Sequence, residues 1–433
     1  MPAIAKILII FASMLTLARL KVQLGLALVL GGLVLNFWAG FSFLESLSHL
    51  GHALVDADVW LLMIITVLVM ELGRFITEKR NADEIIGATR RWGGRHGRAA
   101  SLMALPAMIG LVPMPGGALL SAPFIEKAAE PDGGSREWMS GVNYWFRHIW
   151  EYWWPMYPGV IIAMTVFNLE LPVFVAVQFL FTPVAILAGY IFMIRPHVRR
   201  LADQKAEVTE RSPRIWLIIT PLIIILASLL FLPGLLKPFL AEGAESSGKM
   251  LSFLIGLLIA LTVVYFDEVR ECRCMLPRAM FSSMLKWKSI NIIISLAGVL
   301  VFKVLLISSG LLPVASQELV QSGIPVVAAI AALPFLAGLV TGVALGFAGT
   351  SFPLIVGLMS VDQAGITPLA TLVLSYGFGY MGMMLSPVHL CLLVTRDYFD
   401  ASMRKIYRQI MPCVLVILFY CIVAHLLLAW FKL

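Results

Sequence analysis

A nine-residue sequence occurs twice in this chain of 433 residues, with the copies about half a chain length apart. It reads ALPAMIGLV at Ala104–Val112 and ALPFLAGLV at Ala332–Val340, and six of the nine positions are identical. Each copy runs into a glycine-rich segment, PMPGGA at 113–118 and GFAGTS at 346–351. Similarity at such a long period predicts a chain built from two related halves.

The prolines that follow the two copies keep the same spacing. Pro123 and Pro353 lie 230 residues apart, and Pro158 and Pro387 lie 229 apart. Two unrelated helices, each kinked by glycine and proline, would be the alternative source of this pattern. In a very apolar chain, a repeat that covers each half is typical of secondary transporters.

Composition places both halves in a lipid bilayer. Hydrophobic residues make up 60% of the chain and charged residues only 13%, which is too apolar for the core of a soluble protein. A helix needs about 20 consecutive apolar residues to cross a bilayer. We therefore expect one all-α integral membrane domain over residues 1–433. Only Lys6 is charged in the first apolar run, which predicts a first span and no cleavable signal peptide.

Ten apolar stretches are expected to cross the membrane, five in each half. They lie near 3–18, 22–40, 59–76, 141–164, 173–194, 214–232, 249–266, 289–309, 370–394 and 410–432. Between the third and fourth stretch of each half lies the repeated element, at 99–125 and 326–356. Glycine and proline interrupt each of these elements, and we expect both to be re-entrant hairpins that enter and leave on one side.

Five spans and one hairpin give an odd number of crossings. The second half, 214–433, is therefore expected to insert upside down relative to the first half, 1–194, with 195–213 as a basic linker. Of the 32 Lys and Arg residues, 26 fall on one side of this arrangement and four on the other. The positive-inside rule then predicts cytoplasmic basic loops, a cytoplasmic-membrane location and both termini outside. The net charge of +7 is explained by these loops and not by nucleic acid.

Cysteine usage predicts neither a disulfide framework nor a metal centre. The chain has five cysteines, and no paired CxxC spacing occurs among them. We therefore expect no metal and no cofactor.

Two basic residues, Arg147 and Lys303, are counted on neither side because they lie within predicted spans, where a charge is costly without a partner or water. Arg147 and Glu151 are four residues apart, so on one helix they would share a face and could simply neutralise each other. Alternatively, Arg147 binds an anion while Glu151 or the neighbouring His148 carries a proton. Lys303 fits a structural ion pair or a substrate contact equally well.

The expected binding site lies where the two hairpin tips meet near the bilayer midplane. Helix N-termini at such breaks expose N–H groups that suit an anion. Besides Arg147, the candidate substrate-binding residues are Pro115, Gly116, Gly117, Gly349, Thr350, Ser351 and Ser386. The glycines could instead only permit close helix packing. His389 is a second titratable candidate or a satisfied buried histidine.

Aromatic residues crowd the span that contains Arg147. They are Tyr144, Trp145, Trp150, Tyr152, Trp153, Trp154 and Tyr157. Such a cluster is more typical of an interfacial belt or of packing than of a wall that stacks sugars.

The sequence PMPGGALLSAP at 113–123, the Ser386–Pro387 step and the paired hairpins resemble the ion transporter superfamily of gluconate permeases, dicarboxylate carriers and citrate carriers. More narrowly, the chain resembles an uncharacterised prokaryotic family of gluconate-permease-like membrane proteins. The resemblance implies inverted repeats, carboxylate substrates, proton or sodium coupling, and often dimers. The Ser-Asn-Thr hairpin signature of the sodium-coupled dicarboxylate carriers is absent from both tips, so proton coupling is favoured over sodium.

The expected function is secondary active transport of a small organic anion, a carboxylate or sugar acid, with proton coupling and a possible homodimer. An exporter or antiporter of an ion or lipid-linked anion is the alternative within transport. An intramembrane enzyme is less expected because the chain lacks HEXXH and GxSxG motifs. A channel is less expected because the two dissimilar hairpin tips do not form a repeated filter ring.

Overall fold

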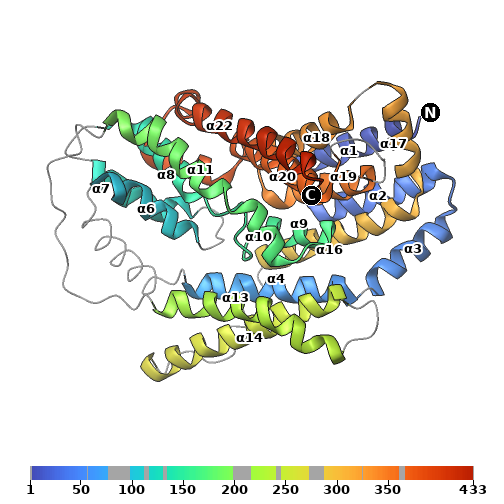
Figure 1. The fold of residues 1–433 in the computed structure, drawn as a ribbon, viewed down its shortest axis with the longest axis horizontal. Helices are drawn as coiled ribbons and strands as arrows, with labels where there is room; N and C mark the ends of the chain where they lie inside the picture. The colour runs from blue at the N-terminus through green and yellow to red at the C-terminus, as the bar shows by residue number, and fades with distance from the viewer. Residues whose placement is uncertain are drawn as a thin grey trace.

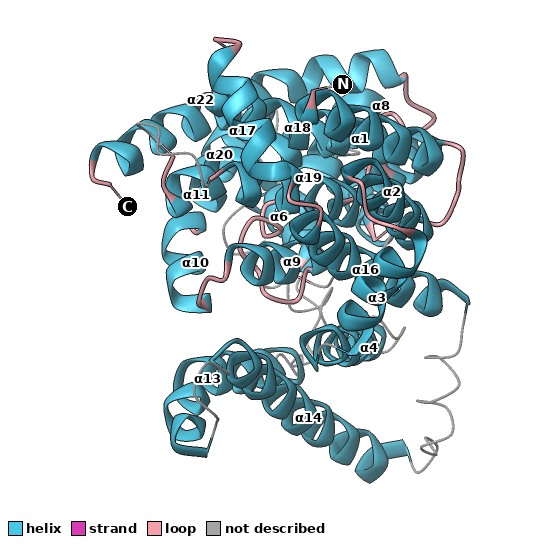
Figure 2. Cartoon of the chain, turned by 90° about the vertical axis from the view of Figure 1, so that its right-hand side faces the viewer, coloured by secondary structure: helices cyan, strands magenta, loops and turns pink. Residues whose placement is uncertain are grey.

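The described part of the chain is entirely helical (Figures 1 and 2). The structure, a computed structural model, describes residues 2–55, 57–76, 98–111, 117–129, 134–197, 216–239, 245–272, 287–323, 325–359 and 366–432. An all-helical architecture was expected from the apolar runs, because only helices and closed barrels satisfy the backbone in lipid.

Helices of the first half follow one another in the order that the apolar stretches predict. They are α1 (Ala3–Arg19), α2 (Leu24–Ala39), α3 (Phe43–Val55), α4 (Ala57–Ile76), α6 (Arg98–Gly110), α7 (Ala118–Ala129), α8 (Arg136–Arg147), α9 (Pro158–Phe167), α10 (Leu171–Gln178) and α11 (Phe181–Gly189), which continues through a π-helical turn (Tyr190–Ile194) and a 3₁₀ turn (Arg195–His197).

Helices of the second half are α13 (Trp216–Leu236), α14 (Glu245–Cys272), α16 (Trp287–Ser308), α17 (Leu311–Gln321), α18 (Val326–Thr341), α19 (Ala344–Leu358), α20 (Pro368–Met384), α21 (Leu390–Phe399) and α22 (Met403–Trp430), with a 3₁₀ turn (Lys237–Phe239) after α13. Each of the ten predicted spans falls on one or more helices. The short helices α3 and α17 were not predicted.

The helices include candidates for membrane spans. Within the described residues, Leu171–His197 and Met403–Trp430 are long and apolar enough to cross a membrane. Eight further apolar helices are shorter, between 10 and 17 residues. The fold is therefore compatible with a helical membrane protein.

Helices α4, α13 and α14 form a layer along one side of the molecule (Figures 1 and 2). Helix α16 joins this layer to the rest, because it packs against both α4 and α2. The contact between α16 and α2 requires glycine: a Cβ added to Gly298 would lie 2.3 Å from the Cα atom of Gly25. Small residues allow such close helix contacts in membrane proteins.

The repeated element forms a pair of packed helices in each half, α6 with α7 and α18 with α19. The turn of the second pair lies at Gly342–Val343, where Gly342 has a φ of +65°. The expectation that 346–351 interrupts the helix is wrong, because these residues lie within α19. In the first pair, Pro113, Pro115 and Gly116 lie outside the described residues, whereas Gly117 is described and buried.

Both proline-broken spans are interrupted as expected. Helix α8 ends at Arg147, residues 148–157 form turns, and α9 begins at Pro158. Helix α20 ends at Met384 and α21 begins at Leu390. Proline suits the first position of a helix because its missing N–H has no partner there. Because α8 ends at Arg147, the expectation that Arg147 and Glu151 share a helix face is wrong.

Candidate functional site: the junction of two broken helices

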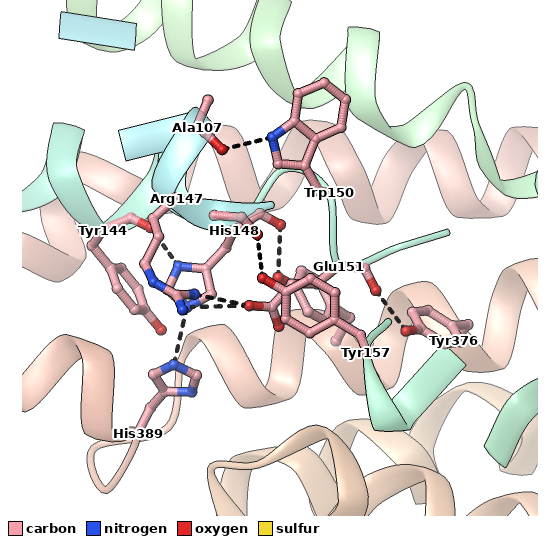
Figure 3. A network of polar contacts seen from close by, with 11 residues as sticks. Ala107, Tyr144, Arg147, His148, Trp150, Glu151, Tyr157, Tyr376 and His389 are labelled. Carbon is pink, nitrogen blue, oxygen red and sulfur yellow. Dashed lines mark hydrogen bonds and ion pairs between the residues drawn. The ribbon is translucent and has the colours of Figure 1, made fainter. Parts of the chain in front are cut away.

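The two helix breaks lie against each other in the core. His148, directly after α8, and His389, directly before α21, bring their Nε2 atoms to 3.2 Å (Figure 3). Both side chains are buried. Residues 241 positions apart in the sequence therefore form the centre of this junction.

A buried ion pair lies beside the two histidines. The Arg147 guanidinium donates to Glu151 Oε1 at 3.0 Å, and both side chains are less than a tenth exposed. Oε1 of Glu151 also lies 3.8 Å from Nε2 of His148. Arg147 is the last residue of α8, and His148 and Glu151 lie in the turns that follow it (Figure 3). A buried charge of this kind needs a hydrogen-bonded partner, and Glu151 supplies it for Arg147.

Tyrosines of α20 satisfy the carbonyl groups that the first break exposes. Tyr376 donates its hydroxyl to the main-chain oxygen of Glu151 at 2.6 Å, and Tyr380 donates to that of His148 at 2.8 Å. Thr182 donates to the main-chain oxygen of Ile149 at 2.6 Å. These donors replace the helical hydrogen bonds that the broken segment lacks, which apolar surroundings require.

One end of each helix pair reaches one of the breaks. Gly110, the last residue of α6, accepts a hydrogen bond from the Tyr157 hydroxyl. A Cβ at Gly110 would lie 2.0 Å from the main-chain oxygen of Arg147. In the second half, a Cβ at Gly342 would lie 2.9 Å from Ser386 Oγ and 3.0 Å from the main-chain nitrogen of His389. The end of α6 and the turn between α18 and α19 thus lie next to the broken helices.

Two helix N-termini converge beside this junction. Helices α9 and α19 begin without a side-chain cap. A Cβ at Gly159 would lie 2.8 Å from the Ala344 side chain and 3.5 Å from the Tyr376 hydroxyl. Uncapped N–H groups and the positive end of the helix dipole are suited to an anion.

The remaining candidate substrate-binding residues lie at different positions around the junction. Ser386 is buried in the second break. Thr350 and Ser351 are buried in α19 and donate to the main-chain oxygens of Gly346 at 2.7 Å and Phe347 at 2.5 Å.

Two other candidates are associated with α16. Gly349 faces this helix, because a Cβ there would lie 2.4 Å from Val299 Cγ2. Lys303 is itself on α16 and is half-buried. The structure therefore brings together Arg147, His148, Glu151 and His389, with Ser386 adjacent, and places Gly349 in a helix contact.

The aromatic cluster packs in the interior. Tyr144, Trp145, Tyr152, Trp154 and Tyr157 are buried, which agrees with packing and not with an interfacial belt. Tyr144 also donates to the main-chain oxygen of Met384 at 3.0 Å and thereby connects α8 to the end of α20.

The sequence analysis missed Tyr380 and Cys391. The spacing of Tyr376 and Tyr380 places both hydroxyls on one face of α20, a signal that could have been noticed beside a predicted break. Cys391 joins His148 and His389 in a buried group whose ligand atoms all lie within 4.8 Å of one another. A search for CxxC spacing does not find it, because its members come from both halves of the chain.

The fold and the junction define an all-helical protein, compatible with a membrane protein, in which two interrupted helices meet at buried charged and imidazole side chains. A family model described as "Protein of unknown function (DUF401)" matches residues 3–428. The chain belongs to this family, as its resemblance to an uncharacterised family suggested. No curated protein matches the chain.

Proposed function

We propose that this protein is a secondary active transporter of a small organic anion, a carboxylate or sugar acid, driven by protons. The observation that carries the proposal is the buried group of Arg147, His148, Glu151 and His389 at the meeting point of two interrupted helices. Discontinuous helices that place their termini and polar groups together are how many transporters build a substrate site. No enzymatic activity is part of the proposal.

The proposed architecture is a pair of inverted repeats, as in the ion transporter superfamily. Its support is that each half contains a packed helix pair followed by a helix broken at its centre, in the same order. The cytoplasmic membrane, with both termini outside, is the proposed location. Single cysteines introduced within 77–98 or 195–213 should then resist impermeant thiol reagents in intact cells, and ready labelling from outside would mean that the orientation is reversed.

The proposed transport cycle uses the Arg147–Glu151 pair. The guanidinium binds the carboxylate of the substrate, and Glu151 is released from the ion pair and takes up a proton. His148 lies beside this pair, with its Nε2 3.8 Å from Glu151 Oε1, and its Nε2 is 3.2 Å from that of His389. The uncapped N-termini of α9 and α19 supply further N–H donors for the anion.

Uptake into proteoliposomes under an imposed pH gradient tests the function. A panel of labelled carboxylates and sugar acids should contain at least one substrate that accumulates only with the gradient. With that substrate, Glu151→Gln should abolish pH-driven accumulation but retain exchange, while the exposed control Glu126→Gln behaves as wild type. Absence of gradient-dependent flux across the panel would contradict the proposal, and so would undiminished accumulation by Glu151→Gln.

A further inference from the structure

We propose that His148, His389 and Cys391 form a binding site for a thiophilic divalent cation of the Zn²⁺ class. The three side chains are buried. Each histidine can supply one ring nitrogen as a ligand atom, and the cysteine can supply its Sγ. These ligand atoms all lie within 4.8 Å of one another. Two imidazoles and one thiolate are ligands that Zn²⁺ commonly takes.

The distance between the imidazoles fits a shared ion. Zn–N bonds of 2.0–2.1 Å at a tetrahedral angle separate two nitrogen ligands by about 3.3 Å. The Nε2 atoms of His148 and His389 are 3.2 Å apart. The Sγ atom of Cys391, two residues beyond His389, lies within 4.8 Å of a ring nitrogen of each histidine.

The protonation of His148 is also appropriate for a metal ligand. Its Nδ1 lies 2.6 Å from the main-chain oxygen of Tyr144, which can only accept, so Nδ1 carries the hydrogen. In the neutral ring, Nε2 then has its lone pair directed at His389. Metal-binding histidines typically donate their other N–H to a carbonyl or carboxylate in this way.

The surroundings of His389 leave its Nε2 available for a metal. Its Nδ1 is buried without a hydrogen bond of standard geometry to any described residue, although the backbone of Gly342 approaches the ring. With Nδ1 protonated, both imidazoles present a lone pair to the same point. Zn²⁺ would displace the proton of the Cys391 thiol, and this proton leaves to solvent.

The positive charge of the bound metal would help the junction to bind an anion. This part of the inference rests on the proposed function. While Arg147 and Glu151 are paired, they neutralise each other, so the pair by itself has no net charge to attract an anion. A dication bound by one thiolate adds one positive charge beside this pair. Three protein ligands also leave a fourth tetrahedral position for a non-protein ligand, as in open zinc sites. One oxygen of the substrate carboxylate would take that position, and the other would remain available to the Arg147 guanidinium.

Metal analysis of the purified full-length protein tests the site. After incubation with Zn²⁺ and desalting, the wild type should retain about one Zn²⁺ per chain, as a single three-ligand site requires. Cys391→Ser and His389→Gln should lose affinity by at least the roughly 10–100-fold that loss of a supporting group costs. Cys413→Ser is the matched control, because Cys413 is a buried free thiol on α22 outside the histidine group.

Cobalt substitution provides a second, spectroscopic test. Co²⁺ bound by the wild type should show a thiolate-to-metal charge-transfer band, which Cys413→Ser retains and Cys391→Ser loses. If the wild type retains no Zn²⁺, or if Cys391→Ser and Cys413→Ser bind it equally, the metal site is wrong.

Measurements of anion transport distinguish the existence of the metal site from its proposed role in anion binding. Stoichiometric Zn²⁺ without flux of any anion would refute the proposed function while the site stands. Anion flux that is unchanged after removal of the metal would refute the charge role of the ion.

Discussion

Tyr376 donates a 2.6 Å hydrogen bond from its hydroxyl to the main-chain oxygen of Glu151, a residue 225 positions earlier in the chain. The bond holds the carbonyl of a residue whose side chain is paired with Arg147 (Figure 3). Helix α20 therefore supports the backbone of the first break from the second half of the protein. Three of the predictions below examine this junction and the contacts around it.

Tyr376→Phe should destabilise the protein by about 1–3 kcal/mol, because the Glu151 carbonyl would be buried without its donor. The midpoint of unfolding, measured in detergent, should fall accordingly. Tyr190→Phe serves as the control, since the Tyr190 side chain is 38% exposed. Equal midpoints for the two variants would show that the Tyr376 bond contributes nothing to stability.

Arg147→Met should destabilise the protein by about 3–5 kcal/mol, because it leaves the Glu151 carboxylate buried without its partner. The double variant Arg147→Met/Glu151→Leu removes both charges and should recover most of this loss. Unfolding in detergent measures both effects. Under the proposed function, the double variant folds but does not transport. Transport by it would show that the pair is purely structural.

Gly110→Ala should cost about 1–3 kcal/mol, as overpacking of a filled interior does. The added Cβ would lie 2.0 Å from the main-chain oxygen of Arg147, and backbone cannot move aside as a side-chain end can. Gly51→Ala on α3 is the control, because nothing lies within 4 Å of its added Cβ. Thermal unfolding of both variants tests the prediction, which a Gly110→Ala protein as stable as the control would contradict.

Glu318 should attach α17 to the start of α1 in a pH-dependent manner. Its carboxylate accepts from the amides of Ala3 at 2.9 Å and Ile4 at 2.8 Å, and these bonds lower the pKa of Glu318 below 4.5. A pKa lowered by folding contributes stability above the unfolded value and loses it as the pH falls through the folded value.

Hydrogen exchange of the Ala3 and Ile4 amides measures this attachment. At about pH 7, where a carboxylate of ordinary pKa is ionised, the wild type should protect both amides more than Glu318→Gln does. The difference should diminish as the pH falls below 4.5 and vanish below the lowered pKa of Glu318. A difference that is constant across this range would show that the charge of Glu318 does not matter.

The helices and their breaks could be predicted from the sequence because their causes are local. Apolar runs long enough to form helices fall where the structure has them, and Pro158 begins α9 as proline permits at a first helical position. The second tip was placed wrongly at 346–351, because glycine and hydroxyl residues suggested a break. In the structure these residues continue α19, and Thr350 and Ser351 donate to carbonyls one turn earlier within it.

What the sequence by itself determined is the all-helical class, the two helix pairs and the two broken helices. Tertiary structure alone decided that His148 meets His389, that Cys391 joins them, and that Tyr376 and Tyr380 satisfy the first break. The reason is physical. Helix propensity and helix interruption depend on neighbours along the chain. Contacts between the breaks depend instead on close packing through glycines such as Gly110 and Gly342, which sequence periodicity does not encode.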